Sequence, residues 1–133
     1  PHPRPQLLAD KQDVLAAIGD RQICLVNALT AEDYAGDISQ GDRTGHIPSS
    51  INVPTVMLID PITHAYLPAE ELRERFASAG ALDRPRIITY CGGGISATSD
   101  AFVLTLLGAP DIAVYDGSLS EWRADPSLPL QTL

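Results

Sequence analysis

Residues 88–100 read ITYCGGGISATSD and contain the change of pattern that decides the fold. A β-rich run ends at Tyr90, Cys91 follows at once, and three consecutive glycines lead into a segment that can begin a helix. Because glycine loses more conformational entropy on folding than any other residue, a chain that needs only a turn rarely uses three together. The stretch therefore predicts a strand, a loop that requires bare backbone, and a helix.

The same order of strand and helix recurs on both sides of this stretch. Strands are predicted within 21–28, 51–54, 84–90 and 111–117, and helices within 7–20, 30–37, 68–80, 96–108 and 118–125. The helix within 96–108 is expected to direct Ala101, Leu104, Thr105 and Leu107 inward. Strands that alternate with helices at this spacing form parallel βαβ units. We therefore expect an α/β fold, an open parallel sheet with helices on both faces.

The chain has 133 residues, which fits one domain of ordinary size. We expect a catalytic domain at 8–126, an N-terminal extension at 1–7 and a tail at 127–133 that lies on the surface. The net charge of −8 disfavours nucleic acids and anionic membrane surfaces as partners, since no Lys/Arg cluster can neutralise phosphates. No apolar run is long enough to span a bilayer, and the N-terminus shows no signal-peptide core. The oligomeric state is left open.

The chain contains two cysteines, Cys24 and Cys91, far apart in the sequence. Their number favours free thiols in a reducing compartment, so we predict a cytoplasmic location. Cys24 lies in an apolar run and is interpreted as a small buried hydrophobic residue. The cysteines and the three histidines show no ligand spacing of the Cys-x-x-Cys kind, so no metal site is predicted. A thioredoxin-like role would need a resolving cysteine near Cys91, and the sequence has none.

Cys91 is placed where an open parallel sheet carries its functional sites, just past the carboxyl end of a strand. The helix that starts near Ser96 or Ala97 brings its unpartnered N–H groups close to the sulfur. Glycines at 92, 93 and 94 allow successive amides to form a concavity that binds anions. Such surroundings favour the thiolate, the nucleophilic form of cysteine. The alternative is a tight turn beside an inert, buried cysteine.

Three segments, in this order and at these separations, resemble the rhodanese family of sulfurtransferases. They are TGHIPSSINVP at 44–54, CGGGIS at 91–96 and YDGSLSEW at 115–122. The resemblance covers residues 8–126 and implies a rhodanese-like fold. It also implies that Cys91 carries a persulfide, taking sulfur from 3-mercaptopyruvate or thiosulfate and passing it to a thiol or to cyanide. The loop that binds the persulfide anion, with no cofactor, would comprise Gly92, Gly93, Gly94, Ile95, Ser96 and Ala97.

The chain departs from the family pattern where charge is concerned. Many single-domain members have an acidic and a basic residue where this chain has Asn27-Ala28-Leu29. Many also close the loop with an arginine, and this chain has Ser96 at that position. Ser96 resembles the threonine that thiosulfate and mercaptopyruvate sulfurtransferases have there. We expect Ser96 to donate to the sulfur, to cap the helix, or both. Because the loop has no basic residue, it is closer to the mercaptopyruvate type, and Arg43 is our candidate for binding the anionic donor.

Two other functions compete with sulfur transfer. A cysteine phosphatase or arsenate reductase needs an arginine after the loop to hold the oxyanion, whereas this chain has Ala97 and Thr98. A non-catalytic module for partner docking or passive sulfur carriage is the second interpretation. Members that have lost activity usually lose the cysteine, which this chain keeps. His46 is interpreted as a structural part of its turn, and Tyr90 and Trp122 as packing residues.

Overall fold

The computed structural model describes residues 7–36, 43–93 and 95–133. Five strands form one sheet in the order β1-β5-β4-β2-β3, and every pair of neighbours is parallel. The strands are β1 (Leu8–Ala9), β2 (Ile23–Asn27), β3 (Ile51–Asn52), β4 (Arg86–Tyr90) and β5 (Ile112–Tyr115). The expected open parallel sheet is thus confirmed, with one addition. The two-residue edge strand β1, which pairs with β5, was not predicted.

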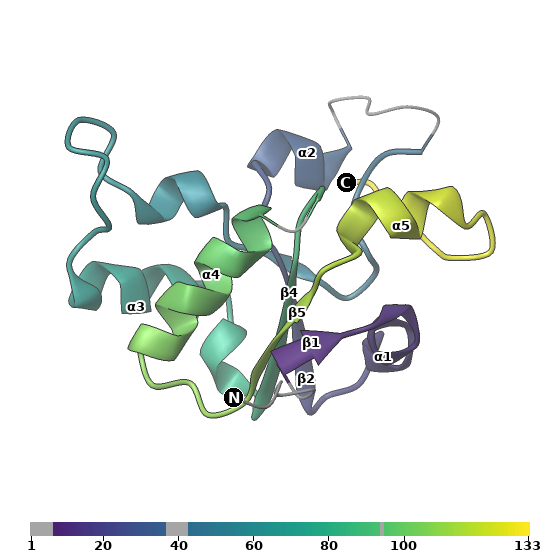
Figure 1. Cartoon of the computed structure of the whole chain (residues 1–133), viewed down its shortest axis with the longest axis horizontal. Coiled ribbons are helices and arrows are strands. Elements are labelled where there is room, and N and C mark those ends of the chain that lie inside the picture. Colours follow the sequence, from purple (N-terminus) through teal and green to yellow (C-terminus); the bar gives the residue numbers. More distant parts are fainter. Residues whose placement is uncertain (1–6, 37–42, 94) are drawn as a thin grey trace, which may run out of the picture.

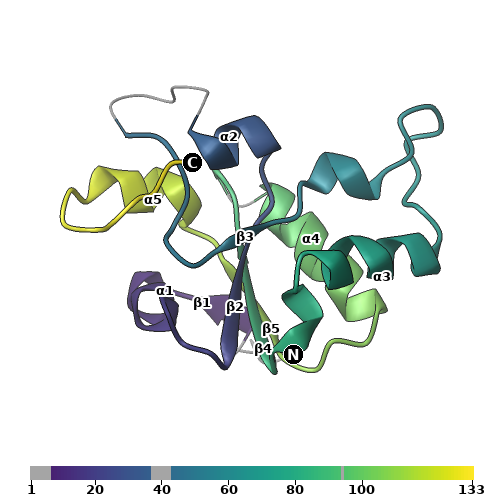
Figure 2. The same ribbon diagram turned by 180° about the vertical axis from the view of Figure 1, so that it is seen from behind.

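Helices cover both faces of the sheet (Figures 1 and 2). Those helices are α1 (Lys11–Ala17), α2 (Ala31–Ala35), α3 (Ala69–Ser78), α4 (Ile95–Leu106) and α5 (Ser118–Ala124), with short 3-10 helices η2 (Thr55–Leu58) and η3 (Ala81–Asp83). One core cluster joins α3 and α4 to the sheet, and a second joins α1 and α5 to its other face. Trp122, fully buried, packs α5 into the second cluster, as the sequence predicts.

Helix α4 follows the glycine loop and packs on β4 and β5. Its buried side chains include Ala97, Ala101 and Leu104, and Leu107 is buried just past the end of the helix. The prediction that Thr105 points inward is wrong, because Thr105 is exposed. Its hydroxyl donates to the Ala101 carbonyl oxygen one turn earlier, at 2.9 Å, which satisfies a hydroxyl on the solvent side of the helix.

The segment 127–133 is mostly exposed, yet several contacts anchor it to the fold. Leu128 is buried in the cluster beneath α5, and the Trp122 indole N–H donates to the Pro129 carbonyl oxygen at 2.8 Å. Gln131 forms an antiparallel bridge with His46. The end of the chain lies beside α2 (Figure 1). The expected surface tail is therefore packed against the domain rather than loosely attached to it.

The order of the strands determines what surrounds the glycine loop. Because β5 lies next to β4 and parallel to it, the turn after β5 and the loop after β4 meet at the same edge of the sheet. Helix α5 begins at that turn and α4 begins at that loop. Within the described part of the chain, none of the helices combines the length and the apolar character that crossing a lipid bilayer requires.

Candidate active site

Cys91 is the first residue after the central strand β4 and is 2% exposed. It packs against Ala28, which follows β2, and against Ala97 in the first turn of α4. Both of these neighbours are fully or almost fully buried. The thiol therefore lies at the carboxyl edge of the sheet, beside the N-terminal end of a twelve-residue helix.

Helix α5 holds the backbone of the loop. The Leu119 N–H donates to the Cys91 carbonyl oxygen at 2.8 Å, and the Ser120 N–H donates to the Gly92 carbonyl oxygen at 2.9 Å. The Ser120 hydroxyl donates to the same Gly92 oxygen at 2.7 Å. In a trans peptide the carbonyl and the following N–H point in opposite directions. The amides of Gly92 and Gly93 therefore point away from α5, as an anion-binding loop requires.

Ser118 is a site residue that the sequence analysis did not identify. Its hydroxyl oxygen accepts a hydrogen bond from the Cys91 N–H at 3.0 Å and lies 4.0 Å from the Cys91 Sγ. The hydroxyl also lies 2.8 Å from the Tyr115 carbonyl oxygen. Since a hydroxyl has one hydrogen, Ser118 can donate either to that carbonyl or to the sulfur. Ser118 is fully buried and has a φ of 50°, a strained value for a residue other than glycine.

The glycines of the loop adjoin open space. A Cβ built at Gly92 or Gly93 meets no atom within 4 Å outside the neighbouring residues, and neither residue lies in the left-handed region. The packing of the protein itself therefore does not require glycine at these two positions. The space next to their Cα atoms is open. Gly94 lies outside the described residues.

The last three predicted loop residues form the first turn of α4. Ile95 is 86% exposed, Ser96 is half-buried and Ala97 is fully buried. Two side-chain hydroxyls hold the carbonyls of this turn. The Thr55 hydroxyl lies 2.9 Å from the Ser96 carbonyl oxygen, and the Thr89 hydroxyl donates to the Ala97 carbonyl oxygen at 2.8 Å. These contacts tie the turn to η2 and to β4.

Asp100 lies one turn further along α4 and is fully buried. Its Oδ1 lies 2.6 Å from the Thr55 hydroxyl oxygen, and its Oδ2 has no hydrogen-bond partner among residues 7–36, 43–93 and 95–133. Burial raises the pKa of Asp100 to about 8, and the Thr55 contact opposes that rise. The sequence analysis assigned this residue no role, since a lone aspartate in a helix carries no signal of burial.

Tyr90 and His46 both have structural partners around the turn at 45–48. The Tyr90 hydroxyl oxygen accepts from the Ile47 N–H at 3.0 Å and lies 2.7 Å from the Ser50 hydroxyl oxygen. Burial raises the pKa of Tyr90 to about 12. The His46 ring stacks on Tyr34 at 3.8 Å, and its Nδ1 lies 2.7 Å from the Tyr34 carbonyl oxygen. Tyr90 holds the turn against β4, and His46 holds it against α2.

Arg43 lies elsewhere in the molecule. Its guanidinium donates to the backbone carbonyl oxygens of Asp125, at 2.8 Å, and of Leu128. These carbonyls follow the C-terminal end of α5, whereas Cys91 lies at the N-terminal end. The seven residues of α5 place the two ends about 10 Å apart. The structure therefore does not bring Arg43 to Cys91, and donor binding by Arg43 stays a prediction.

A pocket of about 460 Å³ opens between α2 and η2. Its apolar wall is formed by Pro54, Val56 and Met57, and Glu32 is its one ionisable lining residue. Two residues next to the lining contact the loop. Leu29, which precedes Thr30, packs with the Cys91 cluster, and Thr55, which lies between Pro54 and Val56, contacts the Ser96 carbonyl. The pocket is therefore adjacent to the candidate active site.

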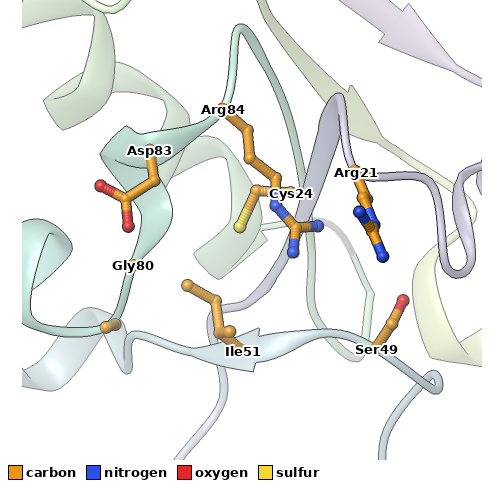
Figure 3. A pocket seen from close by; sticks show the side chains of 8 residues that line it. Arg21, Cys24, Ser49, Ile51, Gly80, Asp83 and Arg84 are labelled. Carbon is orange, nitrogen blue, oxygen red and sulfur yellow. The ribbon is translucent and has the colours of Figure 1, made fainter.

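A second pocket, of about 440 Å³, lies beside the other cysteine (Figure 3). Cys24 lines it together with Arg21 and Arg84, and its thiol is 3% exposed. Burial raises the pKa of the Cys24 thiol to about 11, opposed by the nearby Arg84 guanidinium. Cys24 lies level with Ile87, four residues before Cys91, which corresponds to about 13 Å along the sheet. The interpretation of Cys24 as a buried packing residue is confirmed.

Known proteins share both the sequence pattern and the fold. Residues 10–125 match the family described as "Rhodanese-like domain". The chain is 41% identical over 95 residues to the mitochondrial thiosulfate/3-mercaptopyruvate sulfurtransferase 1 of Arabidopsis thaliana, covering 71% of this chain and 24% of that protein. It is 33% identical to the probable 3-mercaptopyruvate sulfurtransferase of Pseudomonas aeruginosa, covering 98% of this chain and 46% of that protein. This chain thus spans less than half the length of these relatives.

A solved structure shares the fold at lower identity. It is the anaerobic ergothioneine biosynthesis enzyme from Chlorobium limicola, in complex with trimethyl histidine. The TM-score is 0.87 at 24% identity, covering 97% of this chain and 32% of that chain. At this identity the likeness bears on the fold alone, and it agrees with the sheet described above.

Proposed function

The chain belongs to the family of rhodanese-like domains, and from this premise we propose that it is a sulfurtransferase that carries sulfur as a persulfide on Cys91. The observation that carries the proposal is the position of the Cys91 thiol. It lies between the first turns of α4 and α5, where the Ser118 hydroxyl lies 4.0 Å from Sγ and the Gly92 and Gly93 amides are turned away from α5. These groups can stabilise a sulfur anion without a cofactor.

The proposed reaction has two steps. In the first, the Cys91 thiolate attacks the transferable sulfur of the donor, and an S–S bond forms as the donor's bond to that sulfur breaks. The bonding pair leaves with pyruvate enolate, which takes up a proton, or with sulfite when thiosulfate is the donor. In the second step, an acceptor thiolate or cyanide attacks the outer sulfur of the persulfide. The product carries that sulfur away, and the Cys91 thiolate is restored.

Ser118 and the amides of the glycine loop are proposed to stabilise different parts of the persulfide. When negative charge develops on the sulfur, the Ser118 hydrogen can turn from the Tyr115 carbonyl to the sulfur. The amides of Gly92, Gly93, Gly94, Ile95, Ser96 and Ala97 are proposed to donate to the outer sulfur of the persulfide. A preorganised set of donors is effective because it does not have to reorient as the charge forms.

We propose that the donor binds in the adjoining pocket, whose charge favours 3-mercaptopyruvate. The described residues that line this pocket include Glu32 and no lysine or arginine. A thiosulfate dianion would meet more repulsion there than a carboxylate with a single charge. In the wild type, 3-mercaptopyruvate should therefore load Cys91 faster than thiosulfate. Glu32→Gln should narrow that difference, since it removes the pocket's one ionisable group.

The proposal is tested by the mass of the intact protein. After incubation with 3-mercaptopyruvate or thiosulfate, the wild type should gain one sulfur atom, which a reducing agent removes. Cys91→Ser should gain none under the same conditions. If neither donor loads the wild type, or if Cys91→Ser loads equally, the proposed function is wrong.

Passive carriage of sulfur is the alternative to catalysis. The chain spans less than half the length of the relatives named above. If a loaded Cys91 transfers its sulfur to no small acceptor, the result favours a carrier. Many turnovers with a thiol or cyanide acceptor would favour the enzyme. A cytoplasmic location is part of the same proposal, since persulfide chemistry on a thiolate suits a reducing compartment.

A further inference from the structure

A buried carboxyl group beneath the glycine loop is not used by the reaction as proposed. Asp100 extends from α4 toward η2 and is fully buried. A carboxylate is costly to bury without partners, and one oxygen of Asp100 has none. Its other oxygen contacts Thr55, which also contacts the first turn of α4. Asp100 is thus connected to the loop end that carries Ser96.

A count of hydrogens indicates the protonation state that this arrangement needs. The Thr55 hydroxyl oxygen lies 2.6 Å from Asp100 Oδ1 and 2.9 Å from the Ser96 carbonyl oxygen. A carboxylate and a carbonyl both only accept hydrogen bonds, and Thr55 has a single hydrogen to donate. If Asp100 carries a proton, it donates to Thr55, and Thr55 donates to Ser96. Both short contacts are then hydrogen bonds. If Asp100 is ionised, one of them is lost.

The surroundings of Asp100 favour the neutral form. The elements with the closest packing against α4 are β4, β5 and η2. In the described part of the chain, their titratable side chains have partners elsewhere: Arg86 pairs with Asp111, Tyr90 contacts Ser50, and Tyr115 contacts Glu121, while η2 carries none. Helix α3 shares a core cluster with α4, and its Arg73 donates to the Leu107 carbonyl oxygen just past the far end of α4. The neutral Tyr66 hydroxyl contacts Ser99. Burial raises the pKa of Asp100 to about 8.

We propose that Asp100 is a positioning residue for sulfur transfer, which in its protonated form fixes the first turn of α4 through Thr55. Ionisation of Asp100 releases the Ser96 carbonyl from Thr55 and adds a negative charge beneath a loop that has to hold a sulfur anion. The protein therefore transfers sulfur efficiently while Asp100 is neutral and loses efficiency as Asp100 ionises. This inference rests on the proposed function.

The test compares the pH profile of Cys91 loading in the wild type and in Asp100→Asn. The amide of asparagine stays neutral and can donate to Thr55, so it imitates the protonated carboxyl. A pH effect that the two proteins share cancels in the ratio of their rates, so this ratio isolates Asp100. With a pKa of about 8, the wild-type rate relative to Asp100→Asn should fall about tenfold between pH 7 and pH 9. A ratio that stays constant over this range contradicts the proposal.

Variants of Thr55 test the connection itself. Thr55→Ser keeps the hydroxyl and should preserve the wild-type profile, whereas Thr55→Val should load more slowly at pH 7 and lose the fall at high pH. Equal profiles in Thr55→Val and the wild type would contradict the role of Thr55 in linking Asp100 to the loop.

Stability provides a second readout, which does not depend on activity. The folded protein keeps the Asp100 proton up to about pH 8, whereas an unfolded chain loses it near pH 4. The free energy of unfolding therefore falls as pH rises from 4 to 8. The denaturation midpoint of the wild type, relative to Asp100→Asn, should be lower at pH 8 than at pH 5. If Cys91 loads at pH 7 but neither readout differs between the two proteins, the proposed function stands and the role of Asp100 is wrong.

Discussion

Cys24 lies in β2 and Cys91 directly follows the adjacent strand β4, and the two residues have almost the same exposure. Cys24 is 3% exposed and Cys91 is 2% exposed. Cys24 lies inside β2 within an apolar cluster, and burial raises the pKa of its thiol to about 11. Cys91 lies past the end of β4, where the Ser118 hydroxyl and the backbone of α5 surround it. The two cysteines are therefore alike in exposure and differ in the groups that surround their thiols.

The sharpest way to break this comparison is to remove one thiol at a time. Cys91→Ala should abolish loading with sulfur, because the remaining thiol, Cys24, lies in the core and burial raises its pKa to about 11. Cys24→Ala should load to the same extent as the wild type, since Cys24 only fills space in the core. The measurement is the intact mass after incubation with the donor. Loading that requires Cys24 would reverse the assignment.

The next effect concerns the hydroxyl next to Cys91. Ser118→Gly suits the left-handed backbone at this position but removes the hydroxyl that accepts from the Cys91 N–H and lies 4.0 Å from Sγ. A hydrogen bond to a charged group contributes about 1.5–3 kcal/mol, so loss of this donor to the sulfur anion should slow loading by about tenfold or more. The rate of sulfur gain, measured by quenched mass spectrometry, checks this.

Ser120→Ala is the matched control for Ser118→Gly. It also removes a hydroxyl from the first turn of α5, but the Gly92 carbonyl keeps its bond from the Ser120 N–H. We expect a rate within about twofold of the wild type, because the remaining bond still holds the loop. Equal slowing in both variants would show that the Ser118 hydroxyl has no special role.

The same comparison can be made with two glycines, because one lies near each cysteine. Gly92→Ala places a Cβ in the open space over the loop, so we expect several-fold slower loading with stability changed by less than about 1 kcal/mol. Gly80, which lines the pocket beside Cys24, has a φ of 87°. Gly80→Ala should lower stability by about 1–2 kcal/mol and leave loading unchanged. Chemical denaturation and the loading assay together separate the two effects.

The last effect, which concerns stability alone, is the alkaline dependence of unfolding due to Cys24. Its pKa is about 11 in the folded protein and about 8.5 in an unfolded chain. Between these values the folded state keeps a proton that the unfolded state has lost, so stability falls as pH rises. By pH 10 the loss should reach about 1–2 kcal/mol relative to pH 8. Cys24→Ala should lack this loss in denaturation curves at the two pH values.

The sequence predicted the architecture well because periodicity and breakers mark long elements clearly. Pro68 precedes α3, Thr30 caps α2 through the Asp33 N–H, and Gly36 ends α2 with a φ of 90°. The edge strand β1 has two residues, too few for any alternation to be visible. Thr105 was misplaced because helical periodicity alone does not show how wide the buried stripe of α4 is.

The site was predicted less completely, because its partners come from distant segments. Cys91 and its glycines are consecutive in the sequence and are recognised together, but the contact with Ser118 depends on the pairing of β5 with β4. The motif at 115–122 contains Ser118, but only the order of the strands shows that this motif lies next to the loop. Arg43 was chosen for its charge, yet its partners are backbone carbonyls, which leave no mark in a sequence.

The central position of β4 has a consequence for how the protein loses activity. Strand β4 is paired on both sides, with β2 and with β5, and such strands exchange their amide hydrogens only when the whole domain opens. The backbone that carries Cys91 is therefore attached to the slowest-exchanging part of the molecule. Partial opening at the edges, such as release of β1, leaves this attachment intact. In a denaturant titration, sulfur loading should disappear together with global unfolding, not before it.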